Sequence, residues 1–161
     1  MPEFYSRAAH AGRYLSKIIM ETKKYVRIQA RYNGQTGKPV GIFCACHHVV
    51  YSTYCEFNAT DDERETFKDI ENWFEDNLVN PPFYDDGNSK KVITWFKTST
   101  SQNMLERLSP LVEILSKYGV PHDVVYTDHV GNIVYEDEYQ VAVTDYPLTI
   151  NADNQKSELT A

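Results

Sequence analysis

The sequence lacks the features that mark membrane-spanning or secreted proteins. Among its 161 residues, no window approaches the ~18 consecutive apolar residues that a membrane-spanning helix needs. The opening MPEFYSRAAHAGRYLSK does not have the basic-then-apolar order of a secretory signal peptide. We therefore expect a cytoplasmic protein with no membrane partner.

Cysteine is scarce, and basic side chains are outnumbered. Cys44, Cys46 and Cys55 are an odd number of thiols in a short stretch, which favours free thiols over a disulfide framework. With 16 basic and 23 acidic side chains the formal charge is -7, so the field of the molecule repels phosphate backbones. The charge predicts no nucleic-acid partner and favours a basic surface on another protein.

Catalytic signatures are absent as well. Gly34 and Gly37 form neither a GxGxxG motif nor a Walker loop, and no G-x-S-x-G, H-E-x-x-H or kinase signature occurs. No cofactor is therefore predicted, and a non-enzymatic role is favoured.

The apolar residues that are present follow helical and strand periods. A helical period occurs at 3–22, at 61–78 after the capping box Thr60 to Glu63, and at about 103–115. Pro110 in the last of these predicts a kink or a fresh helical start capped by Ser109. Strand patterns occupy 25–32 (half-buried), 40–46, 92–97, 122–127 and 132–143, with a hairpin turn at 130–132.

The resulting order, α-ββ-α-β-α-ββ, predicts an α+β fold. We expect a two-layer sandwich in which a largely antiparallel sheet of about five strands carries the helices on one face. Residues 1–150 would form a single domain, and the polar residues 151–161 a frayed tail. Residues 47–54 fit either a continued strand or a short helix.

A cysteine and histidine cluster follows the second predicted strand. If the strand persists, Cys44, Cys46 and His48 share one face, but alternate residues of a strand lie ~6.5 Å apart, too wide for neighbouring ligands of a tetrahedral ion. We therefore predict no metal site. A nucleophilic cysteine with a histidine base also fits the sequence, and His47 and His48 remain candidate binding residues.

A carboxylate interrupts the last strand pattern. Alternation places Tyr135, Asp137 and Tyr139 on the face toward the core. An enclosed carboxylate needs a partner, for which Arg27 and Arg31, together with the two histidines, are the candidates. The alternative is a bulge or turn near Glu136 that rotates Asp137 into water.

The proline-stiffened segment 80–88 presents aromatic and acidic side chains. Phe83 and Tyr84 would serve as anchors for a partner or a ligand ring, with Asp85 and Asp86 orienting its polar groups. The alternative is that the aromatic rings plug the loop onto the core and the aspartates make turn hydrogen bonds. The acidic spacing does not match a calcium loop.

The runs GKPVGIF, NPPFYDDGN, VITWFK and VYEDEYQVAV resemble a small family of uncharacterised bacterial proteins. The resemblance extends over about residues 38–143. It implies a bacterial or phage origin, and no activity, cofactor or site residue comes with it.

Two functional hypotheses follow. The first is a small acidic, non-enzymatic binding protein of the immunity, anti-defence or adaptor type, because the chain combines negative charge with 12 tyrosines that offer large contact area. The second is a small enzyme or small-molecule-binding domain with a pocket near the 80–88 loop and Asp137. The sequence carries no signal for an oligomeric state.

Overall fold

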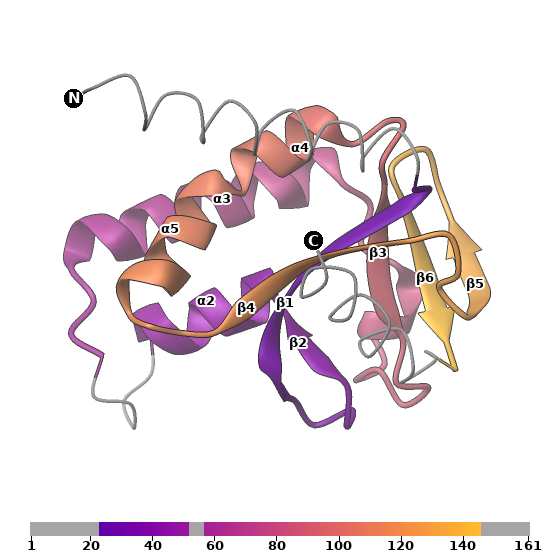
Figure 1. Ribbon diagram of the computed structural model, residues 1–161, viewed down its shortest axis with the longest axis horizontal. Helices are drawn as coiled ribbons and strands as arrows, with labels where there is room; N and C mark the ends of the chain where they lie inside the picture. Colours follow the sequence, from indigo (N-terminus) through magenta and orange to yellow (C-terminus); the bar gives the residue numbers. More distant parts are fainter. Residues whose placement is uncertain (1–22, 52–56, 146–161) are drawn as a thin grey trace, which may run out of the picture.

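The computed structural model of the protein describes residues 23–51 and 57–145 (Figure 1). The helix predicted for 3–22 and the tail predicted for 151–161 lie outside the described residues. Within them, six strands form one antiparallel sheet and the helices pack against it, so the α+β class is confirmed. None of the described helices has the length and apolar character needed to span a bilayer.

Strand β1 (Tyr25–Asn33) joins the parts of the sheet. Its residues 25–30 pair with β4 (His122–Thr127) along one edge. Two strands pair with the opposite edge of β1. The start of β1 pairs with β3 (Ile93–Lys97), and the end of β1 pairs with β2 (Pro39–Gly41). Beyond β3 lie β6 (Gln140–Thr144) and then β5 (Asn132–Glu136).

Both faces of β1 are covered, so the prediction of a half-buried strand is wrong. Ile28 and Ala30 pack in the same apolar cluster as Phe67 and Leu111 of the helices. On the other face Arg27 and Gln29 are buried too, and Arg27 donates a 2.6 Å hydrogen bond to Gln29. A second apolar cluster, which contains Trp95, Val125, Val141 and Val143, lies on that face.

The second predicted strand turns into a helix after three residues. Strand β2 ends at Gly41 and α2 (Ile42–Tyr51) follows at once, so the strand predicted for 40–46 is wrong beyond Gly41. The apolar run fits a helical period as well as a strand, since its buried side chains form one helical face: Ile42, Ala45, Cys46, Val49 and Val50. The hairpin of β1 with β2 is confirmed.

The third helical pattern is divided at its proline. Helix α4 (Gln102–Arg107) ends before Pro110, and α5 (Ser109–Lys117) begins beside it, which confirms the fresh helical start. Ser109 is the first residue of α5 rather than its cap, and the cap position, Leu108, makes no side-chain capping bond. Proline is tolerated there because the first turn of a helix has no intrahelical partner for its N–H groups.

The final strand pattern is two strands rather than one. Strands β5 and β6 pair with each other, whereas β4 pairs with β1, so the hairpin predicted at residues 130–132 is wrong. Residues 130–132 instead carry the chain from one end of the sheet toward the other (Figure 1). Gly131 has φ +102, and a Cβ there would lie 2.7 Å from the Thr144 carbonyl oxygen, so only glycine fits.

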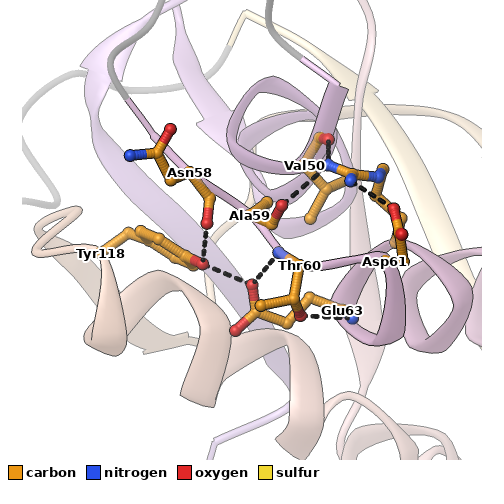
Figure 2. A network of polar contacts seen from close by, with 8 residues as sticks. Val50, Asn58, Ala59, Thr60, Asp61, Glu63 and Tyr118 are labelled. Atoms are coloured by element: carbon orange, nitrogen blue, oxygen red, sulfur yellow. Dashed lines mark hydrogen bonds and ion pairs between the residues drawn. The ribbon is translucent and has the colours of Figure 1, made fainter.

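The capping box of α3 (Asp61–Asn77) is confirmed and also ties three helices together. The Thr60 hydroxyl accepts from the Glu63 N–H, and the Glu63 carboxylate accepts from the Thr60 N–H (Figure 2). The same carboxylate accepts hydrogen bonds from Lys117 and Tyr118 at the end of α5. Arg64 next to it donates to the Val50 and Ala59 carbonyls, which joins α2 to the cluster.

Hydrogen bonds from Lys117 and then Tyr118 hold the pKa of Glu63 at about 2. A carboxyl group with a lowered pKa contributes stability that is present above its unfolded pKa and is lost as the pH falls toward the folded value. Glu63→Gln keeps a capping-box residue at this position but removes the charge.

We therefore expect Glu63→Gln to unfold at lower denaturant concentration than the wild type at pH 7. The difference in unfolding free energy should stay constant above about pH 5 and shrink between about pH 5 and pH 2. Urea titrations at a series of pH values measure it. A difference that does not change over that range would show that the Glu63 charge is not what joins α3 to α5.

Candidate functional site

The outer face of α2 brings together the histidines predicted as binding residues and one cysteine. Because the segment is helical, Cys44 and His48 lie one turn apart on the exposed side, and Cys46 points into the core. The prediction that Cys44, Cys46 and His48 share a strand face is therefore wrong. The Cys44 Sγ lies 3.6 Å from His48 Nε2.

Tyr32 completes this cluster from a different element. Its hydroxyl, near the end of β1, lies 2.9 Å from His48 Nδ1, so the imidazole is held between a phenol and a thiol. In the tautomer whose Nδ1–H donates to Tyr32, His48 Nε2 is free to accept the Cys44 S–H. Cys44 as nucleophile, His48 as base and Tyr32 as the group that orients the base are thus arranged as in enzymes that use covalent catalysis.

The electrostatics hold both described cysteines in the protonated form. Neighbouring atoms shield part of the otherwise exposed Cys44 thiol from water, which raises its pKa, and full burial raises the pKa of Cys46 to about 12. Cys44 is exposed whereas Cys46 is fully buried. Of these two cysteines, Cys44 alone can therefore meet a reagent in the folded protein, and it needs a base to do so at neutral pH.

His47 belongs to an aromatic group rather than to the thiol pair. Its ring lies 4.9 Å from Tyr51 and 5.9 Å from Phe67, measured between ring centroids. Tyr51 is 41% exposed and Tyr32 is 39% exposed, so α2 and the end of β1 present rings to solvent. Within residues 23–51 and 57–145, no three His, Cys, Asp or Glu side chains are placed to hold a metal ion.

Asp137 lies in the turn between β5 and β6 and does not face a cation. It accepts hydrogen bonds from the backbone N–H groups of Tyr139 and Gln140, from the Gln140 amide and from the Tyr135 hydroxyl. Burial alone would raise the pKa of Asp137, but these hydrogen bonds outweigh it and lower the pKa. The predicted turn is therefore present, but Asp137 is part-buried and hydrogen-bonded within it and is not rotated into water.

The partners predicted for Asp137 bond elsewhere. Arg27 donates to Gln29, and Arg31 makes an ion pair with Asp123. The alternating pattern continues through Asp137, so it did not show where the chain reverses. The turn is stabilised by the Asp137 carboxylate, which accepts hydrogen bonds from two backbone N–H groups in place of a backbone partner.

The loop at 80–88 contains a short 3-10 helix, η1 (Pro82–Tyr84). Phe83 and Tyr84 are half-buried, and burial raises the pKa of Tyr84. Asn88 accepts from and donates to the backbone of Val92, which closes the loop. Asp85 and Asp86 are exposed, and the Lys90 ammonium lies 5.5 Å from the centroid of the Phe83 ring, so this segment presents carboxylates to solvent beside a part-buried aromatic pair.

The predicted site residues do not form a single site. His47 and His48 lie on α2, which packs on α3, α5 and β1, whereas Tyr135 and Asp137 lie at the β5 end of the sheet (Figure 1). A hydrogen bond of 2.6 Å from Gln140 to the Val79 carbonyl joins the Asp137 turn to the start of the 80–88 loop.

Sequence reasoning missed an acidic stripe along α3. Asp62, Glu65, Asp69 and Asp76 are exposed and follow one another at intervals of three, four and seven residues, which places them on one helical face. Glu75 and Asp76 stand in the last turn, where no basic residue accompanies them. The helical period already assigned to 61–78 was the signal that could have found the stripe.

Comparisons of the chain with protein-family models, curated proteins and solved structures found no match. The resemblance to a bacterial family stays a prediction.

We expect iodoacetamide to modify Cys44, which is exposed, and not Cys46 in the folded protein. The rate should rise with pH because the thiolate is the reactive form, and the raised pKa of Cys44 moves that rise to higher pH. If His48 takes up the thiol proton, His48→Gln should slow modification of Cys44 at pH 7 by at least about tenfold. His47→Gln is the matched control and should leave the rate unchanged. Peptide mass spectrometry locates the label, and equal rates in both variants would reduce the Cys44–His48 pair to a packing contact.

We expect Asp137→Ala to destabilise the protein by about 1–3 kcal/mol, because four hydrogen bonds to a charged group are lost. Asp86→Ala removes an exposed turn carboxylate and should change the stability by less than about 0.5 kcal/mol. Urea denaturation measures both. Unchanged stability in Asp137→Ala would return Asp137 to the list of functional candidates.

Proposed function

We propose that this protein is a non-enzymatic binding protein that docks its acidic α3 face on a basic surface of a partner protein, which it occludes or bridges. Immunity, anti-defence and adaptor proteins act in this way. The resemblance of the sequence to a bacterial family supports a bacterial or phage origin. The observation that carries the proposal is the acidic stripe of Asp62, Glu65, Asp69 and Asp76.

The acidic residues in the middle and at the carboxyl end of α3 weaken the helix that bears them. The carboxyl end of a helix carries a partial negative charge, so each carboxylate in the last turn costs about 0.3–1 kcal/mol. Glu75 and Asp76 both stand there without a basic neighbour in that turn. Like charges three or four residues apart, such as Glu65 and Asp69, cost a further ~0.2–0.5 kcal/mol per pair. A basic partner would convert this repulsion into attraction.

Two further properties support a protein partner. The net charge of -7 would steer a basic surface toward the molecule over distances of about a Debye length. Tyr32 and Tyr51 offer exposed rings with polar tips, the side-chain type that anchors protein interfaces.

The pocket expected by the alternative hypothesis is not favoured by the geometry. Trp95 is buried at 1% exposure, and Tyr135 donates its hydroxyl proton to Asp137 instead of facing a cavity. One hollow in the described chain is lined by residues of β1, β4, α4 and α5, and a second lies around Pro121 and His122; neither is lined by Asp137 or the 80–88 loop. A thiol-dependent enzyme is a different hypothesis, and it rests on the arrangement of Tyr32, His48 and Cys44. The alkylation of Cys44 described above tests it.

The proposed interface is tested with the immobilised protein in a bacterial lysate. We expect Asp69→Lys/Asp76→Lys to lose a captured protein that the wild type and Glu106→Lys/Glu138→Lys retain. The control pair changes the charge by the same amount at exposed positions outside the stripe. The captured protein should be basic, and its affinity for the purified wild type should fall as salt is raised.

Equal loss of capture in both double variants would mean that net charge, not the stripe, attracts the captured protein, and would refute the α3 interface. A stripe variant that binds normally but unfolds at higher urea would show that the stripe only costs stability. No differential capture at all would contradict the proposed function.

A further inference from the structure

Cys44 and His48 form an exposed pair of metal-ligating side chains on the outer face of α2. They are four residues apart, and the Cys44 Sγ lies 3.6 Å from His48 Nε2. The expectation of no metal site rested on the ~6.5 Å spacing of alternate residues in a strand. Helix α2 removes that objection, because residues four apart on a helix lie one turn from each other on the same side.

The distance between the two donor atoms suits a zinc ion. A zinc–thiolate bond is about 2.3 Å long and a zinc–imidazole bond about 2.0–2.1 Å. Two such ligands at the tetrahedral angle of about 109° are separated by about 3.6 Å. The Cys44 Sγ and His48 Nε2 already have that separation. An ion can therefore take the place of the thiol proton without a change in the helix.

Tyr32 gives His48 the tautomer that a metal ligand needs. The Tyr32 hydroxyl lies 2.9 Å from His48 Nδ1 and accepts a hydrogen bond in the tautomer whose Nε2 lone pair is free. Imidazoles that bind metals usually donate their other ring N–H in this way, and loss of the acceptor costs about 10–100-fold in metal affinity. Because Tyr32 belongs to β1, the fold of the chain orients the ring.

The donor atoms and the charge of the molecule favour the same class of ion. Thiolate and imidazole ligands suit zinc, whereas magnesium and calcium prefer oxygen ligands. The formal charge of -7 attracts cations to the molecule. Since no three His, Cys, Asp or Glu side chains of the described chain surround a common point, the pair leaves two positions of a tetrahedral ion open.

We propose that Cys44 and His48 bind one zinc ion per chain as its two protein ligands, with Tyr32 positioning His48 and water in the two remaining positions. The thiol proton passes to solvent as the zinc–sulfur bond forms. The ion is exchangeable rather than structural, because α2 is held in the fold by a face that the ion does not touch: Ile42, Ala45, Cys46, Val49 and Val50. This inference does not depend on the proposed function, which rests on α3.

The test is a titration of the reduced, metal-free full chain with Co²⁺, which occupies zinc sites and gives a near-ultraviolet charge-transfer band when a thiolate binds it. We expect the band to saturate at one ion per chain, to disappear when Zn²⁺ is added and to persist when Mg²⁺ is added. Cys44→Ser should abolish the band. His48→Gln should raise the dissociation constant by at least about tenfold, because the second ligand acts intramolecularly. His47→Gln is the matched control and should bind like the wild type, because the His47 ring packs beside Tyr51 instead.

Tyr32→Phe distinguishes a positioning residue from a ligand. It removes only the hydroxyl, so the dissociation constant for Co²⁺ should rise about 10–100-fold while the thiolate band keeps its shape. Tyr51→Phe removes a hydroxyl from a similarly exposed ring, and it should leave the dissociation constant unchanged.

A third measurement needs no variant. Saturating Zn²⁺ should slow the modification of Cys44 by iodoacetamide at least about tenfold in the wild type, because the bound thiolate is no longer free to react. EDTA should restore the rate while the protein stays folded, and urea titrations check that each variant folds. The absence of a thiolate band, a band that survives Cys44→Ser, unchanged affinity in Tyr32→Phe, or one ion shared by two chains would each overturn the proposal.

Discussion

The pairing of β1 with three strands is the constraint on which the rest of the structure depends. Its residues 25–30 are bonded to β4 on one edge, and β3 and β2 divide the other. A shift of one residue would turn Arg27 and Gln29 toward the helices and Val26 and Ile28 away from them. The Arg27–Gln29 bond and the apolar helix-side cluster therefore specify the same register from opposite faces.

Elements whose two faces differ could be predicted from the sequence. Helix α3 has a capping box and a polar face, and its predicted start at Asp61 is where the structure begins it. Strands β3 and β4 and the restart of the helix beside Pro110 were likewise readable. At these places the local sequence preferences and the tertiary packing favour the same structure, so these elements can be predicted from one sequence.

Two segments could not be read because their patterns fit more than one structure. Residues 42–46 are apolar at nearly every position, so a buried helix and a buried strand are equally compatible with them. Residues 132–143 keep an alternating pattern through the turn, and only the hydrogen bonds of Asp137 show where the chain reverses. The Tyr32–His48 contact depends on tertiary structure, since it joins β1 to a helix that the sequence left as one of two alternatives at residues 47–54.

Helix α3 carries acidic residues at both ends, and their physical meanings are opposite. At its first turn Asp61, Asp62 and Glu63 meet the positive end of the helix dipole, and Glu63 also holds Lys117 and Tyr118. At its last turn Glu75 and Asp76 meet the negative end, where carboxylates reduce stability. Contacts within the folded chain therefore explain the acidic residues at the start of the helix, but they do not explain those at its end. The proposed docking on a basic partner would account for them, and the exposed stripe continues the charge of Asp76 along one face of the helix.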